Sequence, residues 1–178
     1  MNVVLPFRRA EATESMDWEA LYDEHVGRVY NFFRYRVGDS ATAEDLTATT
    51  FEKAWSRRGQ FRGGVAGFAG WLYTIARNVA NDYFRKSPSL VTLETVGETA
   101  APESLSEQVE RARDFSSLVA AIHKLPSRER DLIALKYGAD LTNREIARQL
   151  NLSESNVGTS LSRTVQRLRR DLEVHDER

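Results

Sequence analysis

The stretch that decides the fold runs from residue 141 to residue 170 and reads LTNREIARQLNLSESNVGTSLSRTVQRLRR. Thr142 and Glu145 match the S/T-x-x-E capping box, which predicts a helix start, and Ser153 can cap a second helix. Asn151, a residue type that tolerates a left-handed backbone, stands between the two helices. Two capped helices joined by a short turn form a helix-turn-helix, although an ordinary helical hairpin in a core shares much of this pattern.

The second of these helices has an apolar side and a polar side. Val157, Leu161, Val165 and Leu168 recur at steps of three and four and predict the side that faces the core. A helix-turn-helix places its second helix in the major groove of duplex DNA, with residues near the helix start touching base edges. The pattern therefore favours DNA binding. The leading turns carry no positive charge, but backbone N–H groups at a helix start can themselves bind phosphate.

The composition fits a folded protein and excludes several classes. The chain has 178 residues, of which 41% are apolar and 29% charged, with a net charge of −1. It has no long apolar run that could span a membrane, and its start lacks a signal-peptide pattern, so we expect a cytoplasmic protein. The absence of cysteine excludes disulfides, thiolate zinc sites and cysteine nucleophiles.

The middle of the chain differs in composition and charge from the segments before and after it. Residues 87–108 contain four glutamates, no basic residue and two prolines, and they show no helical apolar stripe. This composition predicts an acidic flexible linker between two small domains, residues 17–86 and 109–178, with residues 1–16 as an N-terminal extension. The acidity of the linker could mimic a polyanion, or the segment could be a plain tether.

Helical periodicity extends through both domains. In the first, the pattern predicts a helix from residue 18 to 33, a second after the turn at 38–40, and a third after a glycine-rich loop at 61–70. In the second, it predicts a helix around 109–123 and another that starts at Pro126 and ends at Gly138, before the helix-turn-helix. No segment alternates with period two, so we expect an all-α fold whose C-terminal domain has four helices.

The sequence shows no enzyme site. The three histidines are far apart without ligand spacing, and His25 lies in an apolar stripe that predicts a packed structural role. The glycine-rich loop does not match a phosphate-cradling pattern, and the Glu44-Asp45 pair reads as surface charge. We therefore expect no catalytic residue, no metal and no cofactor.

A second stretch combines aromatic and basic residues. Residues 68–86 read FAGWLYTIARNVANDYFRK. Aromatic faces can stack on unpaired bases while cations hold the nucleic-acid backbone. On composition alone, a helix with aromatic core residues and a solvated basic face is slightly favoured.

Three motifs in series resemble one family. AEDLTATTFEKAW (43–55), WLYTIARNVANDYFRK (71–86) and the segment 125–169, which begins LPSRERDLIALKY, are similar in order and spacing to the minimal two-domain type of bacterial extracytoplasmic-function (ECF) sigma factor. The resemblance covers about residues 17–172. It implies a domain that binds polymerase and melts the minus-ten element, followed by a domain that reads the minus-thirty-five element.

The resemblance also implies the contact residues. Polymerase binding would fall on Asp45, Thr49 and Glu52. The candidates for the minus-ten element are Arg62, Trp71, Tyr73, Arg77, Asn78 and Arg85. The candidates for the minus-thirty-five element are Ser155, Asn156, Gly158, Thr159, Ser162, Arg163 and Arg167. Arg169 and Arg170, farther along, are expected to meet phosphate or solvent.

The implied partners are core RNA polymerase, promoter DNA as duplex and as melted non-template strand, and an anti-sigma protein. The alternative is a stand-alone helix-turn-helix regulator, which would usually be a dimer reading a palindrome. This chain departs from the family at Ala48-Thr49, where Gln-Glu is frequent, and at Gly158 and Ser160, where basic residues are common. The second departure predicts a weaker grip on duplex and more dependence on polymerase.

Overall fold

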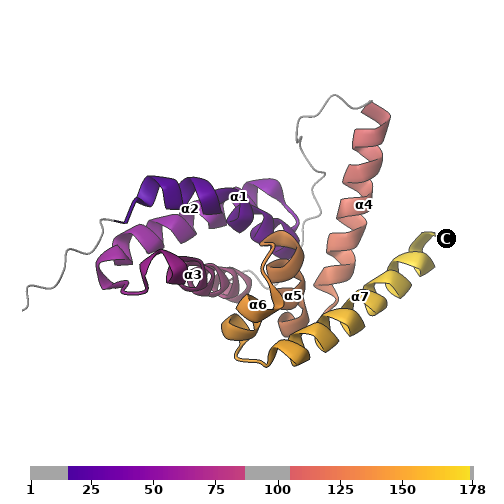
Figure 1. Cartoon of the computed structure of the whole chain (residues 1–178). Coiled ribbons are helices and arrows are strands. Elements are labelled where there is room, and N and C mark those ends of the chain that lie inside the picture. Colours follow the sequence, from indigo (N-terminus) through magenta and orange to yellow (C-terminus); the bar gives the residue numbers. More distant parts are fainter. Residues whose placement is uncertain (1–15, 87–104, 177–178) are drawn as a thin grey trace, which may run out of the picture.

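Only helical elements occur in the part of the chain that the computed structural model describes, residues 16–86 and 105–176 (Figure 1). The first half contains α1 (Trp18–Val37), α2 (Ser40–Arg57), the short 3-10 turn η1 (Arg58–Gln60) and α3 (Gly64–Lys86). The second half contains α4 (Leu105–His123), α5 (Ser127–Ile133), the π-helical turn η2 (Ala134–Gly138), α6 (Asn143–Leu150) and α7 (Glu154–Asp176). The predicted all-α fold is confirmed for these residues.

Local side-chain caps define the helix-turn-helix as predicted. The Thr142 hydroxyl accepts from the Glu145 backbone N–H, and the Glu145 carboxylate accepts from the Thr142 N–H, which completes the capping box. Asn151 ends α6 with φ 53° and ψ 53°, the left-handed conformation. The Ser153 hydroxyl accepts from the Asn156 N–H at 3.1 Å and caps α7.

Two helix starts differ from the predictions. The segment 61–70 is not a loop throughout, because α3 already begins at Gly64. Each glycine costs a helix about 1 kcal/mol relative to alanine. Phe68, which has no exposed surface, offsets this cost by packing against Trp18 and Trp71. The helix expected around 109–123 begins at Leu105, so it includes the last residues of the predicted linker.

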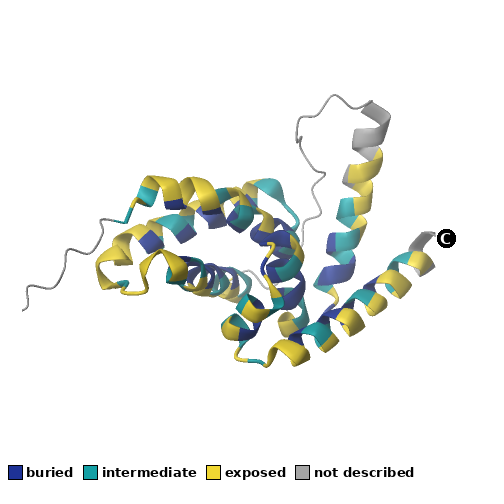
Figure 2. Cartoon of the chain, viewed as in Figure 1, coloured by how far each residue is buried: buried dark blue, intermediate teal, exposed yellow. Residues whose placement is uncertain are grey.

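The two halves share one hydrophobic core (Figure 2). Helix α1 packs against α2 and α3 and also against η2, α4 and α5 of the second half. At Gly138 the backbones come so close that an added Cβ would lie 2.8 Å from the Asn31 carbonyl oxygen and 2.9 Å from Phe32 Cα. The predicted N-terminal extension and linker fall, for residues 1–15 and 87–104, outside the described residues.

The turn η2 carries the chain from α5 toward the helix-turn-helix. The Ala139 N–H donates to the Ala134 carbonyl at 2.9 Å, one residue farther back than in an α-helix. Gly138 ends this turn, as the sequence predicts. Ala134 and Leu135 are buried there, so the widened turn belongs to the core.

Candidate nucleic-acid interface

Helix α2 presents the three predicted polymerase contacts on one side. Asp45, Thr49 and Glu52 follow one another at steps of four and three, and the two carboxylates are exposed while Thr49 is half-buried. Leu46 and Thr50 on the other side are buried in the core. The buried Thr50 hydroxyl has a hydrogen-bond partner, because it donates to the Leu46 carbonyl at 2.7 Å. The helix therefore has an outer acidic face held by a packed inner face.

An aromatic cluster lies at the start of α3. Phe61 stacks on Trp71 with ring centroids 4.7 Å apart, and Trp18 approaches both Trp71 and Phe68 edge-on. Arg62 is exposed, and its guanidinium donates to the carbonyls of Gly59 and Phe61. Trp71 as a whole is half-buried, and Phe61 stacks on one face of its ring.

Three of the predicted minus-ten residues share an accessible stripe. Trp71, Asn78 and Arg85 follow one another at seven-residue steps, which places them on one face of α3. Asn78 and Arg85 are exposed, and Arg85 forms an ion pair with Asp82 at 2.9 Å. This stripe offers a ring, an amide and a cation to a ligand along the helix.

Tyr73 and Arg77, the other two minus-ten candidates on α3, do not lie on this accessible stripe. Tyr73 has no exposed surface, and burial raises the pKa of its phenol. Arg77 donates to an Asp131 carboxylate oxygen at 3.3 Å and to the Gln149 carbonyl at 2.7 Å, and both acceptors belong to the second half of the chain. In this arrangement neither residue faces solvent as a free contact, because the second domain covers this side of α3.

Helix α7 exposes the predicted recognition residues. Val157, Leu161, Thr164 and Leu168 are buried toward the other helices. The predicted residues Ser155, Asn156, Thr159, Ser162, Arg163 and Arg167 are all exposed.

The remaining recognition candidate, Gly158, is half-buried, and an added Cβ would meet Asn143 only at 3.6 Å, so a side chain would fit there. The start of the helix also carries internal contacts. The Ser160 hydroxyl donates to the Asn156 side-chain oxygen at 3.0 Å. The leading end of α7 is therefore small, polar and uncharged on its outer surface apart from Glu154.

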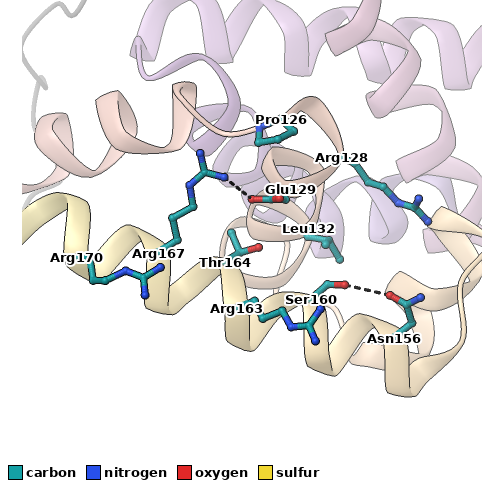
Figure 3. A pocket seen from close by; sticks show the side chains of 10 residues that line it. All are labelled: Pro126, Arg128, Glu129, Leu132, Asn156, Ser160, Arg163, Thr164, Arg167 and Arg170. Atoms are coloured by element: carbon teal, nitrogen blue, oxygen red, sulfur yellow. Dashed lines mark hydrogen bonds and ion pairs between the residues drawn. The ribbon is translucent and has the colours of Figure 1, made fainter.

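A basic groove runs between α5 and α7. It has a volume of about 560 Å³, and Figure 3 shows guanidiniums of α7 along it, with Arg128 of α5 at the other end from Arg170. Arg167 forms an ion pair with Glu129 of α5 at 3.6 Å. The lining residues are Pro126, Arg128, Glu129, Leu132, Asn156, Ser160, Arg163, Thr164, Arg167 and Arg170.

Sequence reasoning missed Arg128 as a member of this groove. It lies about thirty-five residues before Arg163, and only the packing of α5 on α7 brings the two onto one groove. The spacing of Arg163, Arg167 and Arg170, at steps of four and three, was the available signal for a basic edge on α7. With three arginines along one helix and a fourth across the groove, this site suits a polyanion.

The histidines His25 and His123 lie in packed surroundings away from these surfaces. His25 is buried beside Phe68, and burial lowers the pKa of its imidazole, as it also does for His123. Within residues 16–86 and 105–176, no group of three or more His, Asp or Glu side chains is placed to hold a metal ion. A helix long and apolar enough to cross a membrane is likewise not found in that part of the chain.

Comparison with known proteins supplies the family. Residues 21–88 match the family described as Sigma-70 region 2, and residues 115–168 match Sigma-70, region 4. The ECF RNA polymerase sigma factor BldN of Streptomyces coelicolor is 33% identical over 165 residues, which are 91% of this chain but 62% of BldN. The ECF RNA polymerase sigma factor SigM of Bacillus subtilis is 30% identical over 158 residues, which are 86% of this chain and 94% of SigM. The chain belongs to the ECF RNA polymerase sigma factors.

The fold of this sigma factor is also found in solved structures. The sigma factor RpoE of Bartonella quintana, solved in complex with the anti-sigma factor NepR, matches with a TM-score of 0.67 and 22% identity over 89% of this chain and 98% of that one. Helices α1–α3 correspond to region 2, and the region 4 match contains α5 and α6 together with α4 from residue 115 and α7 up to residue 168. The chain is a transcription initiation factor by family, with its candidate DNA surfaces divided between the two regions.

Proposed function

We propose that this sigma factor recruits core RNA polymerase to promoters by reading duplex DNA with α7 and holding the melted strand with α3. The observation that carries the proposal is the exposed polar face of α7 next to the four-arginine groove. A stand-alone regulator accounts for the helix-turn-helix but leaves the region 2 match at residues 21–88 without a role. Action on the chromosome implies a cytoplasmic protein, and we expect no catalytic activity.

In the proposed duplex contact, some residues read base edges and others bind phosphates. Thr159, Ser162 and Arg163 are exposed near the start of α7, where a recognition helix touches base edges. Arg128 and Arg170 lie at the groove, where their guanidiniums can hold phosphates without reading sequence. Since phosphate contacts release counterions, binding through this groove should weaken as salt rises.

Strand binding falls on the accessible stripe of α3. Trp71 can stack on an unpaired base, Asn78 can hydrogen-bond a base edge, and Arg62 and Arg85 can approach the phosphate backbone. Such stacking contributes about 1–3 kcal/mol per base. Because the base must leave the duplex to stack, this energy favours the open promoter over the closed one.

Polymerase binding falls on the outer face of α2. Asp45 and Glu52 offer carboxylates on one side of a rigid helix, and Thr49 lies between them. The face is acidic, so we expect a basic complement on the polymerase. By analogy with the structural neighbour that was solved with an anti-sigma factor, an inhibitory protein is a further expected partner.

Run-off transcription tests the function. Core RNA polymerase is combined with this chain on a library of fragments from the native genome, with core alone as control. We expect discrete transcripts that require the chain and that diminish when Asp45 and Glu52 are both changed to alanine. An active core that yields no chain-dependent transcript would overturn the proposal.

A matched tryptophan pair tests the strand contact. Trp71→Ala should reduce the reactivity of promoter thymines to permanganate, which reports opening, more than it reduces initial duplex binding. Trp55 is the control, since it is 53% exposed but lies on α2 outside the stripe. Equal loss of opening in Trp71→Ala and Trp55→Ala would mean that Trp71 has only a packing role.

A further inference from the structure

An aromatic groove lies between α1, α2 and α3 on the first domain. It has a volume of about 330 Å³, and its lining residues are Trp18, Glu19, Tyr22, Phe51, Trp55 and Phe68. Two of these residues, Tyr22 and Trp55, are 47% and 53% exposed in the described structure. Large apolar side chains that gather around one hollow, unlike those scattered singly over a surface, mark a binding site.

Contacts among the rings fix the shape of this aromatic groove. Trp18 and Trp55 meet edge-on with ring centroids 5.7 Å apart, and Tyr22 meets Phe51 at 4.8 Å. Phe68, which has no exposed surface, packs against Trp18 at 5.5 Å. Because these rings are already positioned, an incoming apolar side chain binds without the entropy cost of ordering them.

The aromatic groove is distinct from the acidic outer face of α2. Each residue of a helix turns the chain by about 100°, so Phe51 and Trp55 lie about 100° and about 60° around α2 from Glu52. The groove borders the face proposed for polymerase without coinciding with it. The contacts proposed for Asp45, Thr49 and Glu52 therefore leave the rings of the groove without a role.

The chain itself supplies an apolar segment next to the groove. The described residues begin at Met16, and Trp18 both begins α1 and lines the groove. Residues 1–15, outside the described part, include the apolar run Val-Val-Leu-Pro-Phe at 3–7. Phe7 precedes Trp18 by 11 residues, which span up to about 38 Å when extended, so the run can fold back into the groove. A short tether also raises the effective concentration of such a segment at its site.

Charge favours one direction for this segment. Two arginines, residues 8–9, follow the apolar run. Between residues 18 and 27, α1 carries three exposed acidic side chains and no basic one, and one of these acids, Glu19, lines the groove. The Arg58 guanidinium lies 3.9 Å from the Trp55 ring centroid, so the α2 end of the groove is already cationic. The two arginines are therefore expected beside α1, with the apolar run reaching toward α2.

We propose that residues 3–7 dock in the aromatic groove of their own chain, and that the arginines at 8–9 pair with the acidic start of α1. The apolar side chains of the run cover the rings of Tyr22 and Trp55, which removes apolar surface on both sides from water. This contact involves neither DNA nor polymerase, so it stands apart from the proposed promoter function.

The acidic linker is a second source of apolar residues, beginning with Leu90 and Val91. Val91 lies five residues after Lys86, an extended span of at most about 18 Å. Lys86 ends α3, and 18 residues of this helix, about 27 Å, separate it from Phe68. These two linker residues cannot reach the Phe68 side of the groove, so a label placed beside them serves as a control.

Tryptophan quenching of a bimane label measures docking. The chain has no cysteine, so Asn2→Cys places a single label just before the apolar run without altering it. Tryptophan quenches bimane on contact, and fluorescence lifetimes give the quenched fraction of the label. Trp55→Phe removes the quencher on α2 but keeps an aromatic ring in the groove. Ser89→Cys, just before Leu90 in the linker, carries the same label as the control.

We expect the Asn2→Cys label to show a quenched fraction that largely disappears with Trp55→Phe and that stays constant when the protein is diluted. Phe7→Ser should lower the ratio of docked to free segment about tenfold, because it removes a ring that docking buries.

A matched tyrosine pair tests the groove itself. Tyr22→Ala should lower the quenched fraction, whereas Tyr137→Ala should leave it unchanged. Tyr137 is a close match, since it is 51% exposed against 47% for Tyr22, but it lies on η2 and does not line the groove. If circular dichroism shows that Tyr22→Ala is not folded, Phe7→Ser gives the same readout without changing the groove.

Four results would each overturn the proposal. The first is quenching of the Asn2→Cys label that does not depend on Trp55, and the second is an equal effect of Tyr22→Ala and Tyr137→Ala. The third is a Ser89→Cys label that depends on Trp55 to the same degree, which would put the linker in the groove. The fourth is a quenched fraction that rises with protein concentration, which would put the segment of a second copy there. Run-off transcription is measured separately, so failure of the proposed function and failure of the docking are distinguishable.

Discussion

Asp131→Ala removes the carboxylate that lies between Arg36 and Arg77. Among the described residues, Arg36 would keep a long contact to the Asn81 side chain, at 3.5 Å, and the face of Phe84. Removing one partner of a buried ion pair typically costs about 3–5 kcal/mol, because the other charge stays buried without compensation. Loss of the Arg77–Asp131 ion pair should add less than about 1 kcal/mol to this destabilisation, because Arg77 is 24% exposed and keeps its hydrogen bond to the Gln149 carbonyl.

Two companion variants isolate the cause. When Arg36→Met is added to Asp131→Ala, both charges are gone, and we expect at least about half of the lost stability to return. Asp82→Ala is the exposed control. Its carboxylate is 43% exposed and pairs with Arg85 and Lys53, so the loss should stay below about 1 kcal/mol.

Urea unfolding followed by two probes measures these values. All three tryptophans lie in the first domain, so their fluorescence reports region 2, whereas far-ultraviolet circular dichroism reports both domains. If Asp131→Ala separates the domains, the two transitions will no longer coincide. Coincident transitions with a loss below about 1 kcal/mol, or an equal loss in Asp82→Ala, would refute the assignment of Asp131 to a buried charge network.

The remaining predictions concern caps, DNA and pH. Thr142→Ala breaks the capping box and should lower the free energy of unfolding by about 1 kcal/mol in the same urea assay; no change would contradict the cap. Arg163→Ala should weaken polymerase-dependent protection of the minus-thirty-five duplex more than Arg169→Ala does. Equal effects of the two substitutions would indicate that Arg163 contributes only its positive charge and makes no contact to a base. Burial lowers the folded-state pKa of His25 and His123 below 6.5, so the unfolded chain binds more protons, and stability should fall as pH drops below about 6.5. Urea midpoints at successive pH values test this, and His25→Leu should flatten the slope.

Features that depend on neighbouring residues could be predicted from the sequence. The capping box at Thr142 and Glu145, the left-handed turn at Asn151 and the buried side of α7 each need only a few adjacent positions. These predictions succeeded because propensity and packing favour the same local structure.

Features that depend on distant residues could not be predicted. Composition marks residues 64–70 as a loop, and only the burial of Phe68 among distant rings explains why the helix starts at Gly64. Arg77 looks like a free cation in the sequence, because its partner Asp131 lies 54 residues away in another domain. Arg128 joins the basic groove for the same reason. In each case, a contact across the fold decides the role of the residue.

The extra residue in the π-helical turn η2 also sets the rotation of α6 and α7 about the helix axis relative to α5. Upstream of η2, Asp131 points toward α3, and at its end Gly138 meets α1. Each residue of an α-helix advances the chain by about 100° around the axis. A deletion of one residue between 134 and 138 could restore a regular helix, but it would turn all that follows, including α6 and α7, by about this angle. The extra residue of η2 thus determines which side of the helix-turn-helix faces region 2.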